Sequence, residues 1–103
     1  MRYQEHCDES IKLFGKPYGE VHSWLDEFAA RREVDGRIAG FNAHHRRHRH
    51  HLAGCEQVRT MWGDDAYNAA VRHVKSDLVR GEGMKESEEI PLDENDYIKK
   101  GFY

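Results

Sequence analysis

The chain has 103 residues, of which 38% are hydrophobic and 34% are charged, and its mean hydropathy is −0.96. This length predicts one domain, residues 1–103, with a small core that needs helix packing, a bound ligand, a metal or a partner for part of its stability. The formal net charge of −3 with neutral histidines disfavours a uniformly basic nucleic-acid binder, although a local basic face is compatible with it.

Two helices are predicted in the first third of the chain. The first covers residues 8–14 and ends at Gly15, because glycine adopts the left-handed conformation found at helix C-termini. After a turn, the second helix starts near Gly19 or Glu20. Its apolar side chains follow the i, i+3, i+4, i+7 spacing of a core-facing stripe. This stripe consists of Val21, Trp24, Leu25 and Phe28.

The apolar pattern changes phase near residues 31–36, which predicts a bend and then a long central helix over residues 35–62. The apolar side of this helix carries Val34, Ile38, Phe41, Leu52, Cys55 and Trp62. A further amphipathic helix is predicted over residues 65–79, and a last short helix is predicted to start with Asp93 as its N-cap. The expected fold is all-α, a compact bundle of four or five helices with one long central histidine-rich helix.

Residues 44–51 hold five of the eight histidines and three arginines. On an ideal helix His44, His48 and His51 share the inward face, with His45 on the same broad side. Arg46, Arg49 and His50 then point roughly the other way. Inward imidazoles must be neutral and hydrogen-bonded, paired with carboxylates, or bound to metal, because an unpartnered buried charge is costly. Metal ligation, a carboxylate–histidine network and a solvated histidine face are the three interpretations.

Two further histidines stand four residues before an aspartate, on the flanks of apolar helix stripes. These pairs are His22 with Asp26 and His73 with Asp77. Residues spaced i, i+4 are neighbours on a helix surface, so each pair presents one imidazole and one carboxylate together. The two aspartates are therefore the expected acidic partners of the inward histidines.

In chain order, the sequence resembles a family of short bacterial and phage helical proteins of uncharacterised function. The resemblance rests on His6, Ser10, a turn at residues 14–17, the VHSWLD stretch at 21–26, HRRHRHH at 45–51 through Gly54, Trp62-Gly63, HVKSDL at 73–78, Ile90-Pro91 and Asp96-Tyr97. The resemblance implies an architecture and site positions but no reaction. The positions that match the family pattern are His22, Asp26, His45, His50, His51, His73 and Asp77.

Together, these patterns predict a metal site built from separate helices, as helical bundles commonly do. The predicted ligands are His22, Asp26, His45, His51, His73 and Asp77, for Zn²⁺, Mn²⁺ or Fe²⁺. Such an ion would lower the pKa of a bound water for phosphoester hydrolysis, with Arg46 or Arg49 holding the phosphate. One alternative is a module that binds nucleic acid or a nucleotide through its arginines. The other is a phage or host interaction protein without catalysis, which would form a defined oligomer or bind a partner.

The sequence also predicts where the protein works. Cys7 and Cys55 lack the density of a disulfide scaffold and contain no CxxC motif, so we expect free thiols in a reducing compartment. No apolar run approaches the roughly 20 residues of a membrane span, and the N-terminal residues are too polar for a signal peptide. We therefore expect a soluble cytoplasmic protein without membrane contact.

Overall fold

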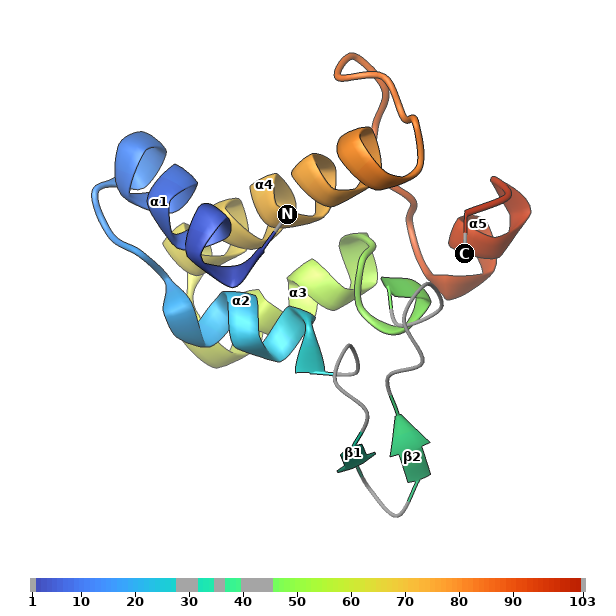
Figure 1. The fold of residues 1–103 in the computed structure, drawn as a ribbon, viewed down its shortest axis with the longest axis horizontal. Helices are drawn as coiled ribbons and strands as arrows, with labels where there is room; N and C mark the ends of the chain where they lie inside the picture. Colours follow the sequence, from blue (N-terminus) through green and yellow to red (C-terminus); the bar gives the residue numbers. More distant parts are fainter. Residues whose placement is uncertain (1, 28–31, 35–36, 40–45, 103) are drawn as a thin grey trace.

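The computed structural model describes residues 2–27, 32–34, 37–39 and 46–102 (Figure 1). Within these residues the fold is all-α with five helices, as predicted, plus one very short antiparallel hairpin. The elements are α1 (Tyr3–Phe14), α2 (Gly19–Leu25), β1 (Arg32–Val34), β2 (Arg37–Ala39), α3 (Leu52–Trp62), α4 (Asp64–Gly81) and α5 (Glu94–Lys99). In the hairpin Arg32 pairs with Ala39 and Val34 with Arg37.

The prediction of one long helix over residues 35–62 was wrong. Residues 37–39, within the range predicted as helix, form strand β2. Residues 46–48 form a single 3-10 turn, and the helix itself begins only at Leu52. The apolar periodicity therefore came from separate short elements, and the described part of the histidine run, residues 46–51, lies before a helix rather than within one.

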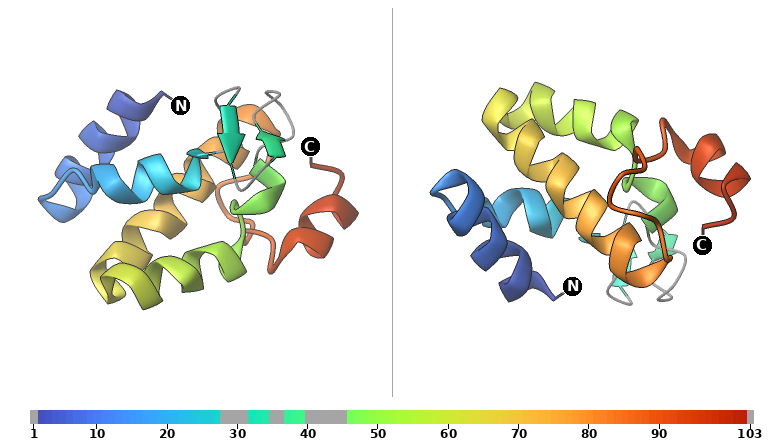
Figure 2. Two further views of the ribbon diagram at one scale, coloured as in Figure 1. Left: turned by 90° about the horizontal axis from the view of Figure 1, so that it is seen from below. Right: turned by 90° about the horizontal axis from the view of Figure 1, so that it is seen from above.

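Helix α4 lies at the centre of the molecule, with α3 on one side and α1 and α2 on the other (Figure 2). Its apolar face packs into a core shared with α2, α3 and the C-terminal segment. This core consists of Val21, Leu25, Cys55, Val58, Ala66, Ala70, Val74, Leu78, Met84, Ile90 and Tyr97. Gly63, with a φ of 96°, allows the sharp reversal between α3 and α4.

The C-terminal segment holds the start of α3 in place. The amides of Leu52 and Ala53 donate to the carbonyls of Pro91 and Leu92 at 2.8 and 2.9 Å, which satisfies two free amides at the helix N-terminus. Asp93 caps α5 by accepting a hydrogen bond from the amide of Asp96, as predicted. In the described part of the chain, no helix combines the length and apolar character needed to cross a membrane.

Candidate metal centre

Six imidazole and carboxylate side chains converge between α1, α2, α4 and the segment that precedes α3. They are His6 of α1, His22 of α2, Asp26 at the C-terminus of α2, His50, and His73 and Asp77 of α4. Five of them are at most 2% exposed, whereas the Asp26 side chain is 24% exposed. The cluster is thus closed on most sides and meets solvent at Asp26.

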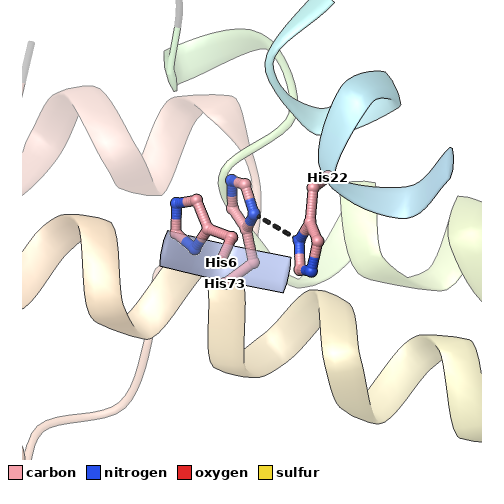
Figure 3. A group of neighbouring side chains, drawn as sticks. All are labelled: His6, His22 and His73. Carbon is pink, nitrogen blue, oxygen red and sulfur yellow. Dashed lines mark hydrogen bonds between the residues drawn. The ribbon is translucent and has the colours of Figure 1, made fainter. Parts of the chain in front are cut away.

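Helical spacing places these side chains beside the core. His73 and Asp77 lie one turn apart on α4, next to the buried Val74 and Leu78, with the His73 Nε2 3.2 Å from an Asp77 oxygen. On α1 the buried residues are His6, Cys7 and Ser10; His6 contacts Asp77 of α4, and Ser10 contacts a histidine of α2. Figure 3 shows His6, His22 and His73 gathered between their helices.

Four of the donors form a closed ring of alternating nitrogen and oxygen atoms. The Nε2 of His50 lies 2.8 Å from Asp77 Oδ2 and 3.4 Å from Asp26 Oδ1. The Nε2 of His73 lies 3.2 Å from the same Asp77 oxygen and 3.3 Å from the same Asp26 oxygen. The planes of the two imidazoles are inclined by 63°, so the rings approach this common centre from different directions.

His6 contacts the opposite side of Asp77. Its Nε2 is 3.0 Å from Asp77 Oδ1. His50 and His73 contact the other oxygen of the same carboxylate, Oδ2. The His6 ring stacks on His73 with 3.6 Å between ring centroids and 17° between planes. Asp77 therefore presents one oxygen to His6 and the other to His50 and His73.

His22 extends the cluster away from the carboxylates. Its Nδ1 lies 2.8 Å from Nδ1 of His73 (Figure 3). Its Nε2 lies 2.8 Å from the hydroxyl of the buried Ser10. When His73 uses Nε2 toward the carboxylates, its Nδ1 contacts His22, and Ser10 completes the bonding of His22. Such outer partners orient a metal-binding histidine and determine its tautomer.

Burial and the neighbouring groups shift the protonation of this cluster. Burial alone would raise the pKa of Asp77, but hydrogen bonds from His50, His6 and His73 outweigh it and hold that pKa far below its usual range. Burial lowers the pKa of His73, yet its bonds to Asp26 and Asp77 prevail and raise it. Burial, together with the nearby His73 and His6, lowers the pKa of His22 to about 3. His73 is thus the favoured site for a proton, and His22 stays neutral.

The two arginines predicted to bind phosphate make internal contacts. Arg46 has its Nε 3.9 Å from Asp77 Oδ2 and its Nη1 3.7 Å from Glu82. Arg49 lies 4.0 Å above the Trp24 ring, donates to the Trp24 carbonyl at 2.6 Å and sits 3.2 Å from Glu27. Arg46 therefore lies at the edge of the cluster, whereas Arg49 ties the segment before α3 to α2.

Four of the six predicted ligands, His22, Asp26, His73 and Asp77, meet in this cluster. His45, like His44, lies outside the described residues. His51 has a different role: its Nδ1 accepts the amide of Gly54 as the N-cap of α3, and its Nε2 lies 3.1 Å from the Arg47 carbonyl. His51 is therefore buried, but its described bonds run to backbone groups of Arg47 and Gly54 and not to the cluster, because residues 46–51 do not form the helix that the spacing assumed.

The cluster also includes two histidines that the predicted ligand set left out. His50 was expected to point away, and His6 was not assigned to the site. Both belong to the segments that carry the family resemblance, which was therefore the better signal. Helical spacing missed them because His6 precedes the predicted first helix, while His50 lies in a turn.

Comparison with known proteins agrees with an uncharacterised family. The model of a family described as Domain of unknown function (DUF6915) matches residues 1–101. No curated protein and no solved structure gives a significant match.

Proposed function

The chain belongs to the DUF6915 family, a domain of unknown function, and we propose from the geometry of its buried cluster that it binds a divalent transition-metal ion. The single observation that carries this proposal is the closed ring of two imidazole nitrogens and two carboxylate oxygens. The proposed ligands are Nε2 of His50, Nε2 of His73, and one oxygen each of Asp26 and Asp77.

The spacing of these atoms suits an ion. Metal–nitrogen and metal–oxygen bonds of about 2.0–2.2 Å in a tetrahedral site leave neighbouring donors roughly 3.3–3.6 Å apart. The four edges of the ring measure 2.8, 3.2, 3.3 and 3.4 Å, so small side-chain movements would admit the ion. A mixed set of imidazole and carboxylate donors suits Zn²⁺, Mn²⁺ or Fe²⁺.

Charge supports the same conclusion. Two carboxylates meet in a largely buried site, and burying them without compensating charge is costly. One divalent ion with neutral imidazoles balances Asp26 and Asp77. Without an ion, a proton on His73 offsets only one of the two carboxylate charges, because Arg46 near Asp77 also lies 3.7 Å from Glu82. This carboxylate–histidine network is the competing arrangement.

The chemistry we propose is hydrolysis of a phosphoester. A bound ion lowers the pKa of water toward neutrality. Water adds to phosphorus, the bond from phosphorus to the leaving oxygen breaks, and the leaving oxygen takes up the proton that the water loses. Asp26 is the partly exposed member of the cluster, so substrate would enter beside it, and Arg46 lies close enough to Asp77 to meet a phosphate oxygen.

Metal analysis of protein purified without a polyhistidine tag tests this proposal. We expect at least one ion per chain by mass spectrometry, and Zn²⁺ or Mn²⁺ binding by calorimetry after EDTA treatment. His50→Ala should weaken binding by roughly 10- to 100-fold or more, in line with loss of ligand-sphere residues. His51→Ala is the matched control from the adjacent position and should keep the affinity.

Two results would overturn the metal assignment. One is a substoichiometric metal content with no effect of chelator on thermal stability. The other is equal loss of affinity in the His51 and His50 variants. Hydrolysis is then measured with p-nitrophenyl phosphate and the Mn²⁺-loaded protein, and activity that survives His50→Ala would contradict the proposed role of the site.

A further inference from the structure

The orientation of His6 is not explained by one ion. An imidazole binds a metal ion in the plane of its ring, along the nitrogen lone pair. The rings of His6 and His73 are nearly parallel, 17° apart, with centroids separated by 3.6 Å. Two such planes do not meet at a nearby point, so the two nitrogens cannot both direct their lone pairs at the same ion. By contrast, His50 and His73 are inclined by 63° and can do so.

Asp77 divides its two oxygens in the same way. Oδ2 faces His50 and His73 at 2.8 and 3.2 Å, whereas Oδ1 faces His6 at 3.0 Å. We propose that a second divalent ion binds at His6 Nε2 and Asp77 Oδ1, so that the Asp77 carboxylate bridges two ions. This inference rests on the proposed function, because the first ion is the one held by the four-donor ring.

The separation of the two ions follows from the stacked rings. An ion in the plane of His6 and an ion in the plane of His73 would lie about as far apart as the rings, since both nitrogens face the same carboxylate. The centroid distance of 3.6 Å falls within the spacing of about 3.5–4 Å that two-metal hydrolytic sites use. Ligand atoms of Asp26 and His6 lie within 4.8 Å of one another, so Asp26 is within reach of the second ion as well.

The number of protein ligands makes the two positions unequal. The first ion has two imidazoles and two carboxylates, whereas the second has His6 and the shared Asp77, with Asp26 nearby. The remaining positions of the second ion are left for water or substrate. It is therefore the weaker and more exchangeable ion, and the one that takes part in substrate binding.

Charge indicates the substrate class. Two divalent ions exceed the charge of Asp26 and Asp77 by two, and the nearby Arg46 is offset by Glu82, 3.7 Å from its guanidinium. A buried excess of two positive charges requires an anion of matching charge. A phosphate monoester carries two negative charges near neutral pH and can place one oxygen on each ion. We infer that the loaded site prefers phosphate monoesters over diesters.

Mn²⁺ titration followed by electron paramagnetic resonance tests the second ion. The wild-type protein, freed of metal with EDTA, should bind two Mn²⁺ per chain in two unequal steps, and the six-line signal of isolated Mn²⁺ should give way to a coupled signal. His6→Phe keeps an aromatic ring in the stack but removes the ligand. It should bind one Mn²⁺ and show only the isolated signal.

Each outcome separates the two proposals. No bound Mn²⁺ in the wild type overturns both the first and the second ion. One Mn²⁺ in the wild type, lost in His50→Ala, upholds the first ion and overturns the second. Two Mn²⁺ that persist in His6→Phe overturn the assignment of His6. Circular dichroism shows whether the variant is folded, and His6→Gln gives a second test if His6→Phe is not.

Inorganic phosphate supplies a readout that does not depend on turnover. We expect it to bind the Mn²⁺-saturated wild type at least tenfold more tightly than the His6→Phe variant. Equal affinity would overturn the inferred role of the second ion in binding phosphate. With p-nitrophenyl phosphate and its diester analogue, a preference for the diester would overturn the inferred substrate class.

Discussion

Asp77→Asn tests the central position of this carboxylate in the metal-free protein. Asp77 is 2% exposed and contacts Nε2 of His6 through one oxygen and Nε2 of His50 and His73 through the other. An ionised carboxylate accepts all three bonds, but an asparagine has only one accepting oxygen. If that oxygen keeps His50 and His73, the amide NH₂ faces His6 and must meet a nitrogen without hydrogen.

His6 can adapt to the amide by changing its tautomer, but the change lowers the free energy of unfolding. Its Nδ1 is buried and has no hydrogen-bond partner among the described residues. Moving the ring hydrogen to Nδ1 frees Nε2 to accept from the amide, but it leaves a buried N–H without an acceptor. Such an unsatisfied donor costs about 1–3 kcal/mol.

The remaining loss of stability comes from replacing the charged carboxylate of Asp77 with a neutral amide. Hydrogen bonds to a charged group contribute about 1.5–3 kcal/mol and neutral ones about 0.5–1.5 kcal/mol, so the bonds to His50 and His73 lose roughly 1 kcal/mol each. With the unsatisfied Nδ1 of His6, we expect Asp77→Asn to lower the free energy of unfolding by about 3–5 kcal/mol. Breaking a buried ion pair has effects of this size, and it is a large part of the roughly 5–15 kcal/mol of a typical domain.

Urea unfolding at pH 7 with EDTA, followed by circular dichroism, measures this loss. Asp65→Asn is the matched control, because Asp65 is exposed on the same helix; its effect should stay within about 1 kcal/mol. A loss below about 1 kcal/mol for Asp77→Asn would refute the reasoning. With excess Zn²⁺, the wild type should gain stability by mass action and the variant should gain much less.

Four further results are expected in metal-free protein. Because the folded-state pKa of His22 is about 3, below its ordinary value of 6.5, the unfolded state takes up a proton first. The contribution of neutral His22 to the free energy of unfolding is therefore fully present above pH 6.5 and falls by up to about 4–5 kcal/mol as the pH is lowered toward 3. His22→Asn should flatten the pH dependence of the free energy of unfolding measured in urea. Ser10→Ala should lower the free energy of unfolding by about 0.5–1.5 kcal/mol, because His22 loses its 2.8 Å bond to the hydroxyl while its hydrogen bond with the Pro17 backbone remains; an unchanged free energy of unfolding would show that the Ser10 bond does not stabilise the fold. His51→Ala should cost about 1 kcal/mol as a lost N-cap, with unchanged metal content, and a loss of metal would contradict its assignment as a cap. Gly54→Ala would place a Cβ within van der Waals overlap of the Arg49 carbonyl oxygen, so we expect the free energy of unfolding, measured by thermal unfolding, to fall by about 1–3 kcal/mol, and a neutral effect would contradict this close approach.

The helix that organises the site was predictable from local pattern. The apolar spacing and the turn at Gly63 indicated a helix over residues 65–79, and α4 runs from Asp64 to Gly81. Because residues four apart face the same way on any helix, His73 and Asp77 had to be adjacent once that helix formed. The cap at Asp93 was equally predictable, since an aspartate N-cap bonds only to amides of its own first turn.

The histidine run was not predictable in the same way, because its conformation is imposed from outside. The carbonyls of Pro91 and Leu92 hold the amides that begin α3, and Gly54 lets the Arg49 backbone approach closely. The first of these contacts joins segments that are distant in sequence, and the second depends on Gly54 having no side chain. A helical periodicity therefore assigned the wrong histidine of the run to the site.

The sequence by itself determined the all-α class, through the apolar spacing along each helix, and the contact between His73 and Asp77, because residues four apart on one helix are neighbours. Only the tertiary structure decided which other imidazoles reach that carboxylate. The packing of α1 on α4 brings His6 to one oxygen of Asp77, and the turn before α3 brings His50 to the other. Neither placement is encoded in local periodicity, since each depends on how one element docks against another.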